Sequence, residues 1–308
     1  MRTEYYFDSH GAGKIHCCRW TPESKPRAVV QIVHGIAEFA LRYDDFAKFL
    51  NSQGFLVVAE DHMGHGKSVG EGGMQGYFHG GWSAAVEDTY HLLKTTMEEF
   101  PDVPYVLFGH SMGSFMARTI LAKYPESGIS AAIICGTGWQ PRAALPALVT
   151  MVEALCKVTG EQKHSKLLDS MAFGSYNKRV EHPRTSCDWL TRDNKVVDEA
   201  AAYTLGAFTS SSGLMRDMMK GIYYIEQPEN LKRMKKELPV WFIAGGDDPV
   251  GNYGKGVQQA AQAFRKVGME KVTVKIYPLC RHEILNEINK EEIYEDVADY
   301  LNKSILSD

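Results

Sequence analysis

Ten residues decide the fold of this chain: Tyr105-Val-Leu-Phe-Gly-His-Ser-Met-Gly-Ser114. The apolar run over residues 105–108 predicts a strand, and the run Ser114 to Tyr124 predicts a helix. The pattern Gly-x-Ser-x-Gly between them predicts a tight turn with Ser111 at its tip, because side chains on the two glycines would crowd the neighbouring strand and helix. We therefore expect a strained turn that lifts the Ser111 hydroxyl above a sheet.

The composition fits a large folded domain. The chain has 308 residues, 44% of them hydrophobic, and a formal net charge of −4. Lys and Arg are scattered, so the charges predict no nucleic-acid partner. The six cysteines form no Cys-x-x-Cys pair, the N-terminus lacks the apolar core of a signal peptide, and no run reaches the roughly 18 apolar residues of a membrane span. These features predict free thiols and a cytoplasmic location.

Strands and helices alternate in both end regions of the chain. Turn residues around Asp8 to Gly13 predict a hairpin. Nearly continuous apolar runs, typical of parallel strands buried on both faces, occur at Ala28–Val33, Phe55–Ala59, Ala131–Cys135 and Pro239–Ala244. Helical patterns separate them, among others at Tyr43–Ser52, Trp82–Phe100 and Lys255–Val267. This alternation predicts an α/β fold with a mostly parallel sheet flanked by helices.

The alternation stops between Trp139 and Pro228. This part is rich in Met, Tyr, Phe and Ser, and it shows helical patches without a clear strand. We therefore expect a first core part at 1–139, a mainly helical cap inserted between late strands at 140–227, and a second core part at 228–308.

One predicted cap helix carries methionines on one side, at Met215, Met218 and Met219. Methionine adapts to irregular apolar ligands, so these side chains are candidates for binding an acyl chain. They would serve equally well to seal the cap onto the core.

A serine hydroxyl becomes a nucleophile when a base takes its proton, and that base needs an acid to orient it. In a sheet of this kind the partners follow later strands, in the order serine, acid, histidine. Asp247 and Asp248 follow a late strand, and we select Asp248 because it precedes the Pro249 turn. His282 follows the predicted strand Val272–Tyr277 and is the candidate base.

Two backbone N–H groups are candidates for stabilising an oxyanion. One belongs to Met112, at the expected helix N-terminus. The other belongs to Ile36, in a loop after an early strand, where Gly35 lets the backbone turn closely. We expect His34 to shape this loop and His110 to point into the fold.

Two other patterns carry less weight. Gly64–Ser68 resembles the end of a phosphate-binding loop, but the position six residues before Lys67, where such a loop needs Gly, holds Asp61. Asp61, His62 and His65 belong to no completed set of metal ligands. The sequence therefore predicts neither a metal nor a cofactor.

The motifs resemble the monoacylglycerol lipase and lysophospholipase group of α/β-hydrolases. The segments that carry the resemblance are His34–Tyr43, Asp61–Ser68, Gly109–Gly113 and Arg281–Glu287. They lie in the core on both sides of the cap. Three positions depart from the group's usual Gly, His and Gly, namely Ala37, Phe39 and Ser114.

The resemblance implies an α/β-hydrolase fold and a fatty-acid ester, or an ester of a similar acyl group, as the substrate. It also implies roles for five residues: a catalytic triad of Ser111, Asp248 and His282, and oxyanion donors at Ile36 and Met112.

The sequence therefore predicts a serine hydrolase that cleaves fatty-acyl esters through an acyl-enzyme, with transient contact to a lipid interface through the cap. The same triad would serve a peptidase of the proline iminopeptidase kind, an amidase or a thioesterase. A peptidase would need cap carboxylates for a substrate amine, and Glu153, Asp169 and Glu181 form no clear cluster. A non-catalytic binding protein is a further alternative, which the presence of all three triad residues disfavours.

Overall fold

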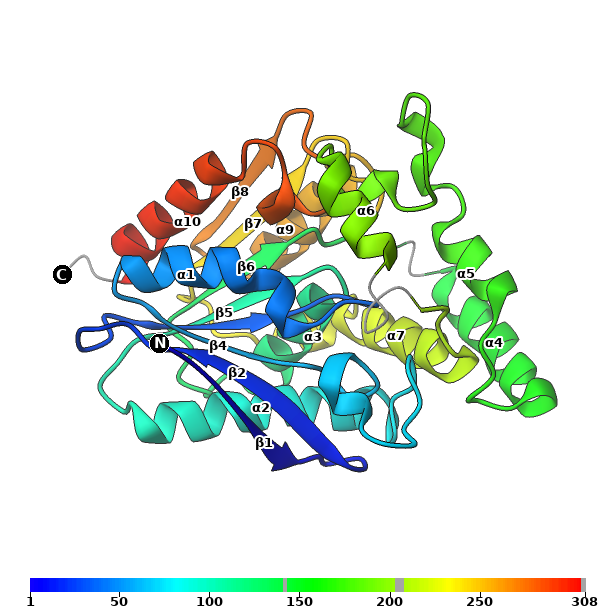
Figure 1. Ribbon diagram of the computed structural model, residues 1–308, viewed down its shortest axis with the longest axis horizontal. Helices are drawn as coiled ribbons and strands as arrows, with labels where there is room; N and C mark the ends of the chain where they lie inside the picture. The colour runs from blue at the N-terminus through cyan, green and yellow to red at the C-terminus, as the bar shows by residue number, and fades with distance from the viewer. Residues whose placement is uncertain (141–142, 203–207, 306–308) are drawn as a thin grey trace.

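The computed structural model describes residues 1–140, 143–202 and 208–305. Eight strands form one sheet (Figure 1). They are β1 (Arg2–Asp8), β2 (Lys14–Trp20), β3 (Val29–Val33), β4 (Leu56–Glu60), β5 (Tyr105–His110), β6 (Ala131–Cys135), β7 (Val240–Gly245) and β8 (Val272–Tyr277). The core helices are α1 (Asp44–Ser52), α2 (Gly81–Glu99), α3 (Met112–Lys123), α9 (Lys255–Lys266) and α10 (Lys290–Ile305).

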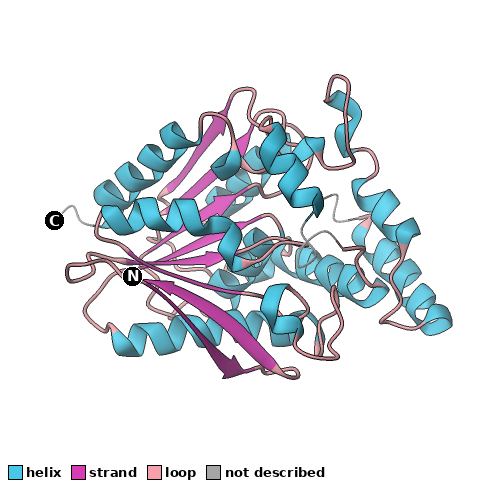
Figure 2. Ribbon diagram, viewed as in Figure 1, coloured by secondary structure: helices cyan, strands magenta, loops and turns pink. Residues whose placement is uncertain are grey.

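The sheet runs in the order β1-β2-β4-β3-β5-β6-β7-β8. The hairpin β1–β2 is antiparallel and joins β4 in antiparallel register, whereas every pair from β4 to β8 is parallel. The predicted fold class, a mostly parallel sheet flanked by helices, is confirmed (Figure 2). The carboxyl ends of the parallel strands meet at one edge, where open α/β sheets bind their ligands.

The strands are buried on both faces, which explains their continuous apolar sequences. In β3, Val29 and Val33 pack into one hydrophobic cluster with residues of α2, α3 and α9. Val30 and Ile32 pack into the other cluster, with residues of α1 and α10. Alternate residues of one strand therefore hold helices on opposite faces of the sheet.

The connection from β6 to β7 is helical in its described parts. It contains α4 (Leu145–Thr159), α5 (Lys166–Phe173), α6 (Asn194–Ala202), α7 (Ser212–Ile225) and α8 (Pro228–Leu231), with short 3-10 turns η3 (Tyr176–Arg179) and η4 (Asp188–Leu190). Residues 141–142 and 203–207 of the predicted cap lie outside the described residues. The boundaries 140 and 227 stay a prediction.

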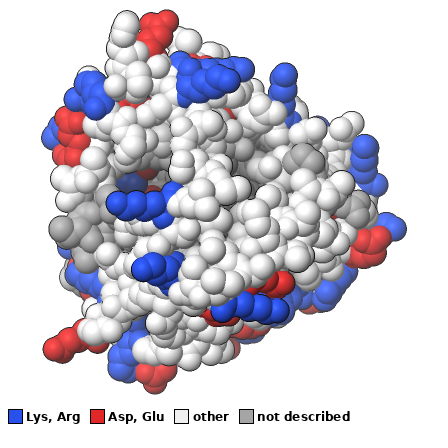
Figure 3. Space-filling view, turned by 90° about the vertical axis from the view of Figure 1, so that its right-hand side faces the viewer, with Lys and Arg blue, Asp and Glu red and all other residues white. Residues whose placement is uncertain are grey.

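The cap helices α4, α5 and α6 lie beyond the strand ends, on the right of Figure 1. Seen from that side, the surface is hollowed, with Lys and Arg groups near the hollow and charged groups of both signs around the rim (Figure 3). Among the described residues, no helix has both the length and the apolar character that crossing a membrane requires.

Candidate active site

Ser111 stands in a sharp, strained turn between β5 and α3. Its backbone has φ 53° and ψ −122°, a conformation that residues with a side chain rarely adopt. A side chain at Gly113 would meet the carbonyl oxygens of Val33 and His34, and one at Gly109 would meet the Gly113 carbonyl. The two glycines are therefore needed for close packing, as the sequence pattern predicts.

His282 and Asp248 form a buried pair at the same edge of the sheet. The distance between His282 Nδ1 and Asp248 Oδ1 is 3.0 Å. The two residues are 2% and 0% exposed, so water does not screen the interaction. The Val250 N–H donates to the same carboxylate oxygen at 2.9 Å, in the turn through Pro249. Asp247, the rejected neighbour, is exposed.

The loop after β6 brings the serine close to this pair. The Ser111 N–H donates to the Cys135 carbonyl at 3.0 Å. The next residue, Gly136, lies against the His282 ring, because a side chain there would come within 3.1 Å of His282 Cε1. Among the described residues, no hydrogen bond joins the Ser111 hydroxyl to His282. Such bonds are often long in unliganded sites and tighten when substrate binds.

The loop after β3 approaches the serine from the other side. A side chain at Gly35 would come within 2.9 Å of Ser111 Cβ. The N–H groups of Ile36 and Met112 have no acceptor among the residues that the structure describes. Ala37 has φ 56°, in the left-handed region that glycine favours. The loop is therefore held in a tight conformation with donors left for a ligand.

Beneath this loop lies a buried carboxylate that the sequence reasoning left without a role. Glu38 is 4% exposed, and its Oε1 accepts hydrogen bonds from the Gly35 N–H, from Tyr43 Oη at 3.0 Å and from His110 Nδ1 at 3.0 Å. His110 Nε2 lies 3.4 Å from the His282 carbonyl oxygen. His110 therefore points into the fold, as predicted, and it links the two loops that flank Ser111.

Arg42 extends this network to the residue after His282. Its guanidinium donates to both carboxylate oxygens of Glu283, at 2.7 and 2.8 Å, and lies 3.4 Å from Glu38. No ion pair between Glu38 and Arg42 is among the sequence predictions, although the two residues are only four positions apart. The Glu283 partner, 241 residues away, has no sequence signal.

The charges of this network stabilise one another. Burial opposes the charged form of His110, but the adjacent Glu38 carboxylate outweighs burial and raises the pKa of His110. At Glu38, burial raises the pKa, but the neighbouring His110 and Arg42 outweigh burial, and the pKa is lowered. Burial also raises the pKa of Glu283, but the Arg42 guanidinium outweighs burial, and the pKa of Glu283 is lowered. Two carboxylates and two cations thus form an electrically balanced cluster.

The Asp61 segment braces the floor of this region through hydrogen bonds to neighbouring backbone groups. Asp61 Oδ1 accepts from the Ala40 N–H at 2.7 Å, and Oδ2 accepts from the Lys67 N–H at 2.8 Å. The His62 N–H donates to His34 Nε2 at 2.9 Å. Burial lowers the pKa of His34 well below its usual range, so the ring is a neutral acceptor.

The cap contacts the loop that carries His282 through the turn η4. The His282 N–H donates to the Trp189 carbonyl at 3.4 Å, and the Glu283 N–H donates to the Leu190 carbonyl at 2.7 Å. The Trp189 ring faces the His282 ring with centroids 5.0 Å apart. Trp189 is therefore a cap residue at the site that the sequence reasoning missed, because the cap offered no motif.

The three methionines of α7 lie at the interface between cap and core. Met215 and Met218 are buried in the cluster that also holds α2 and α3 residues, and Met219 is partly buried against it. This packing is compatible with both roles predicted for them.

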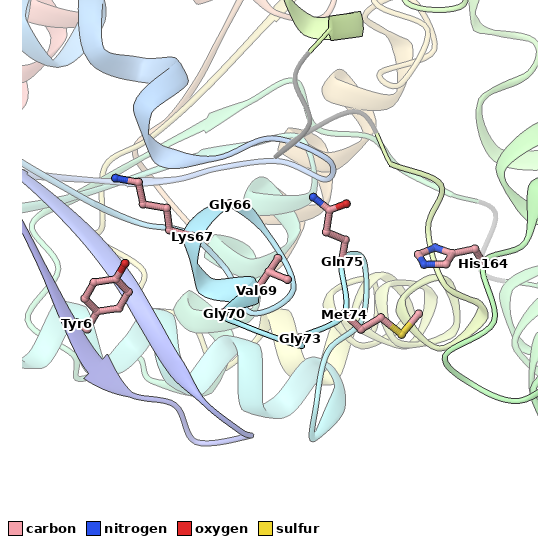
Figure 4. A pocket seen from close by; sticks show the side chains of 9 residues that line it. All are labelled: Tyr6, Gly66, Lys67, Val69, Gly70, Gly73, Met74, Gln75 and His164. Carbon is pink, nitrogen blue, oxygen red and sulfur yellow. The ribbon is translucent and has the colours of Figure 1, made fainter.

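An open groove of about 710 Å³ lies between β1, the loop at 66–75 and the cap (Figure 4). Tyr6, Lys67, Met74 and His164 are among its lining residues, and Ser111 is not. Lys67 is paired with Glu4 at 2.5 Å. The groove therefore lies outside the Ser111 region.

Comparisons with known proteins identify the family of this chain. The family model described as "Serine aminopeptidase, S33" matches residues 24–289. A monoacylglycerol lipase of Mycolicibacterium smegmatis is 27% identical over 300 residues, which cover 97% of each chain. A monoglyceride lipase homolog of Monkeypox virus is 37% identical over 235 residues, covering 71% of this chain and 82% of that protein.

A solved structure gives the same result. A highly thermostable carboxyl esterase from Bacillus coagulans, in complex with glycerol, superposes with a TM-score of 0.92 at 32% identity and 99% coverage of both chains. The chain therefore belongs to the serine aminopeptidase, S33, family and is an α/β-hydrolase of the monoacylglycerol lipase group.

Proposed function

We propose that this protein hydrolyses carboxylic esters of fatty-acyl type through a covalent acyl-enzyme. Ser111 is the nucleophile, His282 the general base and Asp248 the group that orients His282. The backbone N–H groups of Ile36 and Met112 form the oxyanion hole. The observation that carries the proposal is the buried pair of His282 and Asp248, 3.0 Å apart, beside a serine held in a strained turn.

The proposed reaction has two halves, acylation of Ser111 and hydrolysis of the acyl-enzyme, and His282 acts as the base in both. His282 Nε2 takes the proton of the Ser111 hydroxyl as the oxygen attacks the ester carbonyl, and the two N–H groups stabilise the resulting oxyanion. The alcohol leaves with that proton as the acyl-enzyme forms. His282 then takes a proton from water, which attacks the acyl group, and the fatty acid departs as the proton returns to Ser111. Asp248 keeps Nδ1 protonated throughout.

Ester hydrolysis is favoured over aminopeptidase chemistry, which the family description suggests as the second candidate. An aminopeptidase needs a free carboxylate for the substrate's amino group. Glu153 is paired with Lys220 at 2.6 Å, and Asp169 accepts from the Ser210 N–H at 3.2 Å. Glu181 is exposed on the cap. The three carboxylates therefore supply no shared amine site, whereas the apolar side chains of α7 suit an acyl chain.

A substrate panel tests the proposal. Wild-type protein should hydrolyse p-nitrophenyl esters and monoacylglycerols far faster than prolyl-naphthylamide. An acyl thioester and an acyl amide with the same acyl chain test the thioesterase and amidase alternatives. Ser111→Ala should lose ester turnover by several orders of magnitude. Preferred cleavage of the prolyl amide would replace the ester proposal with the peptidase, and equal turnover by Ser111→Ala would refute the serine mechanism.

We further propose that α4 and α5 touch a lipid interface. The exposed face of α4 carries Ala147, Met151, Ala154 and Val158 at helical spacing. Met151 and Val158 are 42% and 86% exposed. On α5, Leu167 and Met171 are also exposed, and Lys157, Lys163 and Lys166 lie near these apolar groups in the sequence. Apolar groups flanked by lysines suit an anionic membrane surface.

Sedimentation with anionic vesicles tests this surface. Val158→Asp should weaken vesicle binding severalfold without lowering the unfolding midpoint, because the side chain is exposed. Thr159→Asp adds the same charge off the apolar face and should bind nearly as wild type. Equal binding by both variants would contradict the assignment of the face.

A further inference from the structure

A second, smaller cavity lies where the cap meets the two loops that carry Asp248 and His282. Its volume is about 170 Å³. Its lining residues are Tyr176, Arg179, Val180, Arg192, Asp247, Leu279 and Arg281. This volume is below the roughly 300–1,000 Å³ typical of sites for drug-sized ligands, so the cavity suits a small polar group.

Three guanidinium groups give the cavity a positive character. Arg192 is already committed, because it donates to Glu287 at 2.8 Å and to Asn289 at 2.7 Å. Arg281 uses Nη1 to donate to the Asp188 and Thr191 carbonyls, at 2.7 and 2.9 Å. These two bonds fix the Arg281 side chain, while its Nη2 and Nε have no acceptor within the described part of the chain.

Arg179 is the least committed of the three. Within residues 1–140, 143–202 and 208–305 it forms no ion pair, and its guanidinium lies over the Tyr253 ring, 3.4 Å from the centroid. Stacking on an aromatic ring holds a guanidinium in place without using its N–H groups. Asp247 is the carboxylate in the lining, and it is exposed and pairs with none of the three arginines in the described structure.

We propose that this cavity binds a phosphate group, with Arg179 and Arg281 as its main donors. A guanidinium offers a planar fork of N–H groups that matches the oxygens of a phosphate, and such charge-assisted bonds are short and strong. Arg192, neutralised by Glu287, shapes the wall, and Asp247 limits the net positive charge. The phosphate comes either from free inorganic phosphate or from the headgroup of a lipid ester.

The cavity is connected to the candidate active site by direct contacts. Arg281 precedes His282, and Asp247 precedes Asp248. The Tyr176 ring, which lines the cavity, lies 4.8 Å from the Trp189 ring, and Trp189 lies 5.0 Å from the His282 ring. A bound phosphate would therefore sit next to both loops that hold the proposed acid and base.

Isothermal titration with inorganic phosphate at constant ionic strength tests binding without any turnover. Wild-type protein should give a saturable signal, and Arg179→Gln should weaken affinity by about fivefold or more, because it removes a charge-assisted contact. Asp247→Asn should tighten binding by roughly threefold, because it removes a repelling charge. Arg184→Gln is the matched control, since this exposed cap arginine is paired with Asp198 outside the cavity and should bind as wild type. Circular dichroism confirms that each variant is folded.

The source of the phosphate is decided by a second measurement, whose headgroup arm rests on the proposed ester hydrolysis. KM is compared for a lysophospholipid and a monoacylglycerol with the same acyl chain. A KM raised in Arg179→Gln for the lysophospholipid alone assigns the site to a headgroup. Unchanged KM values with weakened phosphate binding assign it to free phosphate.

Failure of the phosphate site is distinguishable from failure of the proposed function. The absence of saturable phosphate binding to wild type, together with unchanged KM values in Arg179→Gln, overturns the phosphate site while leaving ester hydrolysis intact. Equal phosphate affinity in Arg179→Gln and Arg184→Gln, with KM values equal to wild type, overturns it as well. A lack of ester turnover overturns the proposed function alone, because the titration does not depend on it.

Discussion

The core beneath Ser111 and the cap above it use charged residues in opposite ways. In the core, Glu38, Arg42, His110 and Glu283 are buried and bound to one another, and they tie the loops on both sides of Ser111 together. In the described cap, arginines such as Arg179 and Arg184 are exposed or stacked at the surface. The core network fixes geometry, whereas these two cap arginines keep their charges at the surface.

The largest effect is expected from disrupting the proposed acid–base pair of Asp248 and His282 in the core. Asp248→Asn should lower kcat by roughly a thousandfold to ten-thousandfold with little change in KM, because His282 would no longer be held in the required tautomer. Steady-state kinetics with a p-nitrophenyl ester measure this change. Asp102→Asn, at an exposed turn, is the control and should keep wild-type kinetics. A comparable kcat in Asp248→Asn would remove Asp248 from the triad.

The next effect concerns stability. Arg42→Met leaves Glu38 and Glu283 without their shared cation, and burial of unpaired charge should lower the free energy of unfolding by about 3–5 kcal/mol. Urea unfolding followed by circular dichroism measures it. Arg184→Met, made in the cap, should hardly move the unfolding midpoint. If the two variants unfolded alike, the contrast between core and cap would be lost.

A pH-dependent effect separates His110 from an ordinary buried residue. Its pKa is raised by Glu38, so its stabilising contribution is fully present below the unfolded value of about 6.5 and is lost as the pH rises through the folded pKa. The pKa of Glu38 is lowered, so its own contribution is lost only at acidic pH. His110→Gln should therefore lower the free energy of unfolding more at about pH 6 than at about pH 9, as measured by urea unfolding at the two pH values. A cost independent of pH would show that His110 is neutral in the folded protein.

The smallest effect tests backbone strain in the oxyanion loop. Ala37 has φ 56°, where a glycine avoids the steric conflict of a Cβ atom. Ala37→Gly should raise the free energy of unfolding by up to about 1 kcal/mol, measured by urea unfolding. Ala154→Gly, on the exposed face of helix α4, is the matched control and should be destabilised instead. Destabilisation of both would argue that Ala37 adopts its conformation without strain.

The features that depend on local sequence pattern could be predicted from the sequence alone. The apolar runs of β3, β5 and β7 predict buried parallel strands, because each face of these strands contacts helices. The Gly-x-Ser-x-Gly turn follows from packing limits at its two glycines. Asp248 and His282 lie together because strand order along the chain matches their positions at one edge of the sheet.

The features of the site that could not be predicted depend on contacts between segments far apart in the sequence. The contact between Arg42 and Glu283 spans 241 residues, and nothing in either segment specifies the other. Trp189 reaches His282 through η4, a three-residue turn that no periodic pattern announces. The three arginines that line the small cavity come from separate segments of the chain, so only the folded chain brings them together.

Covalent labelling tests whether Ser111 is a nucleophile activated by His282. A fluorophosphonate reacts with a serine only when a base activates its hydroxyl, and mass spectrometry of the digested protein locates the adduct. We expect a single rapid adduct on Ser111 and a much slower reaction in His282→Asn. If wild-type protein stayed unlabelled at Ser111, or if His282→Asn were labelled there as fast as wild type, Ser111 would not be a nucleophile activated by His282.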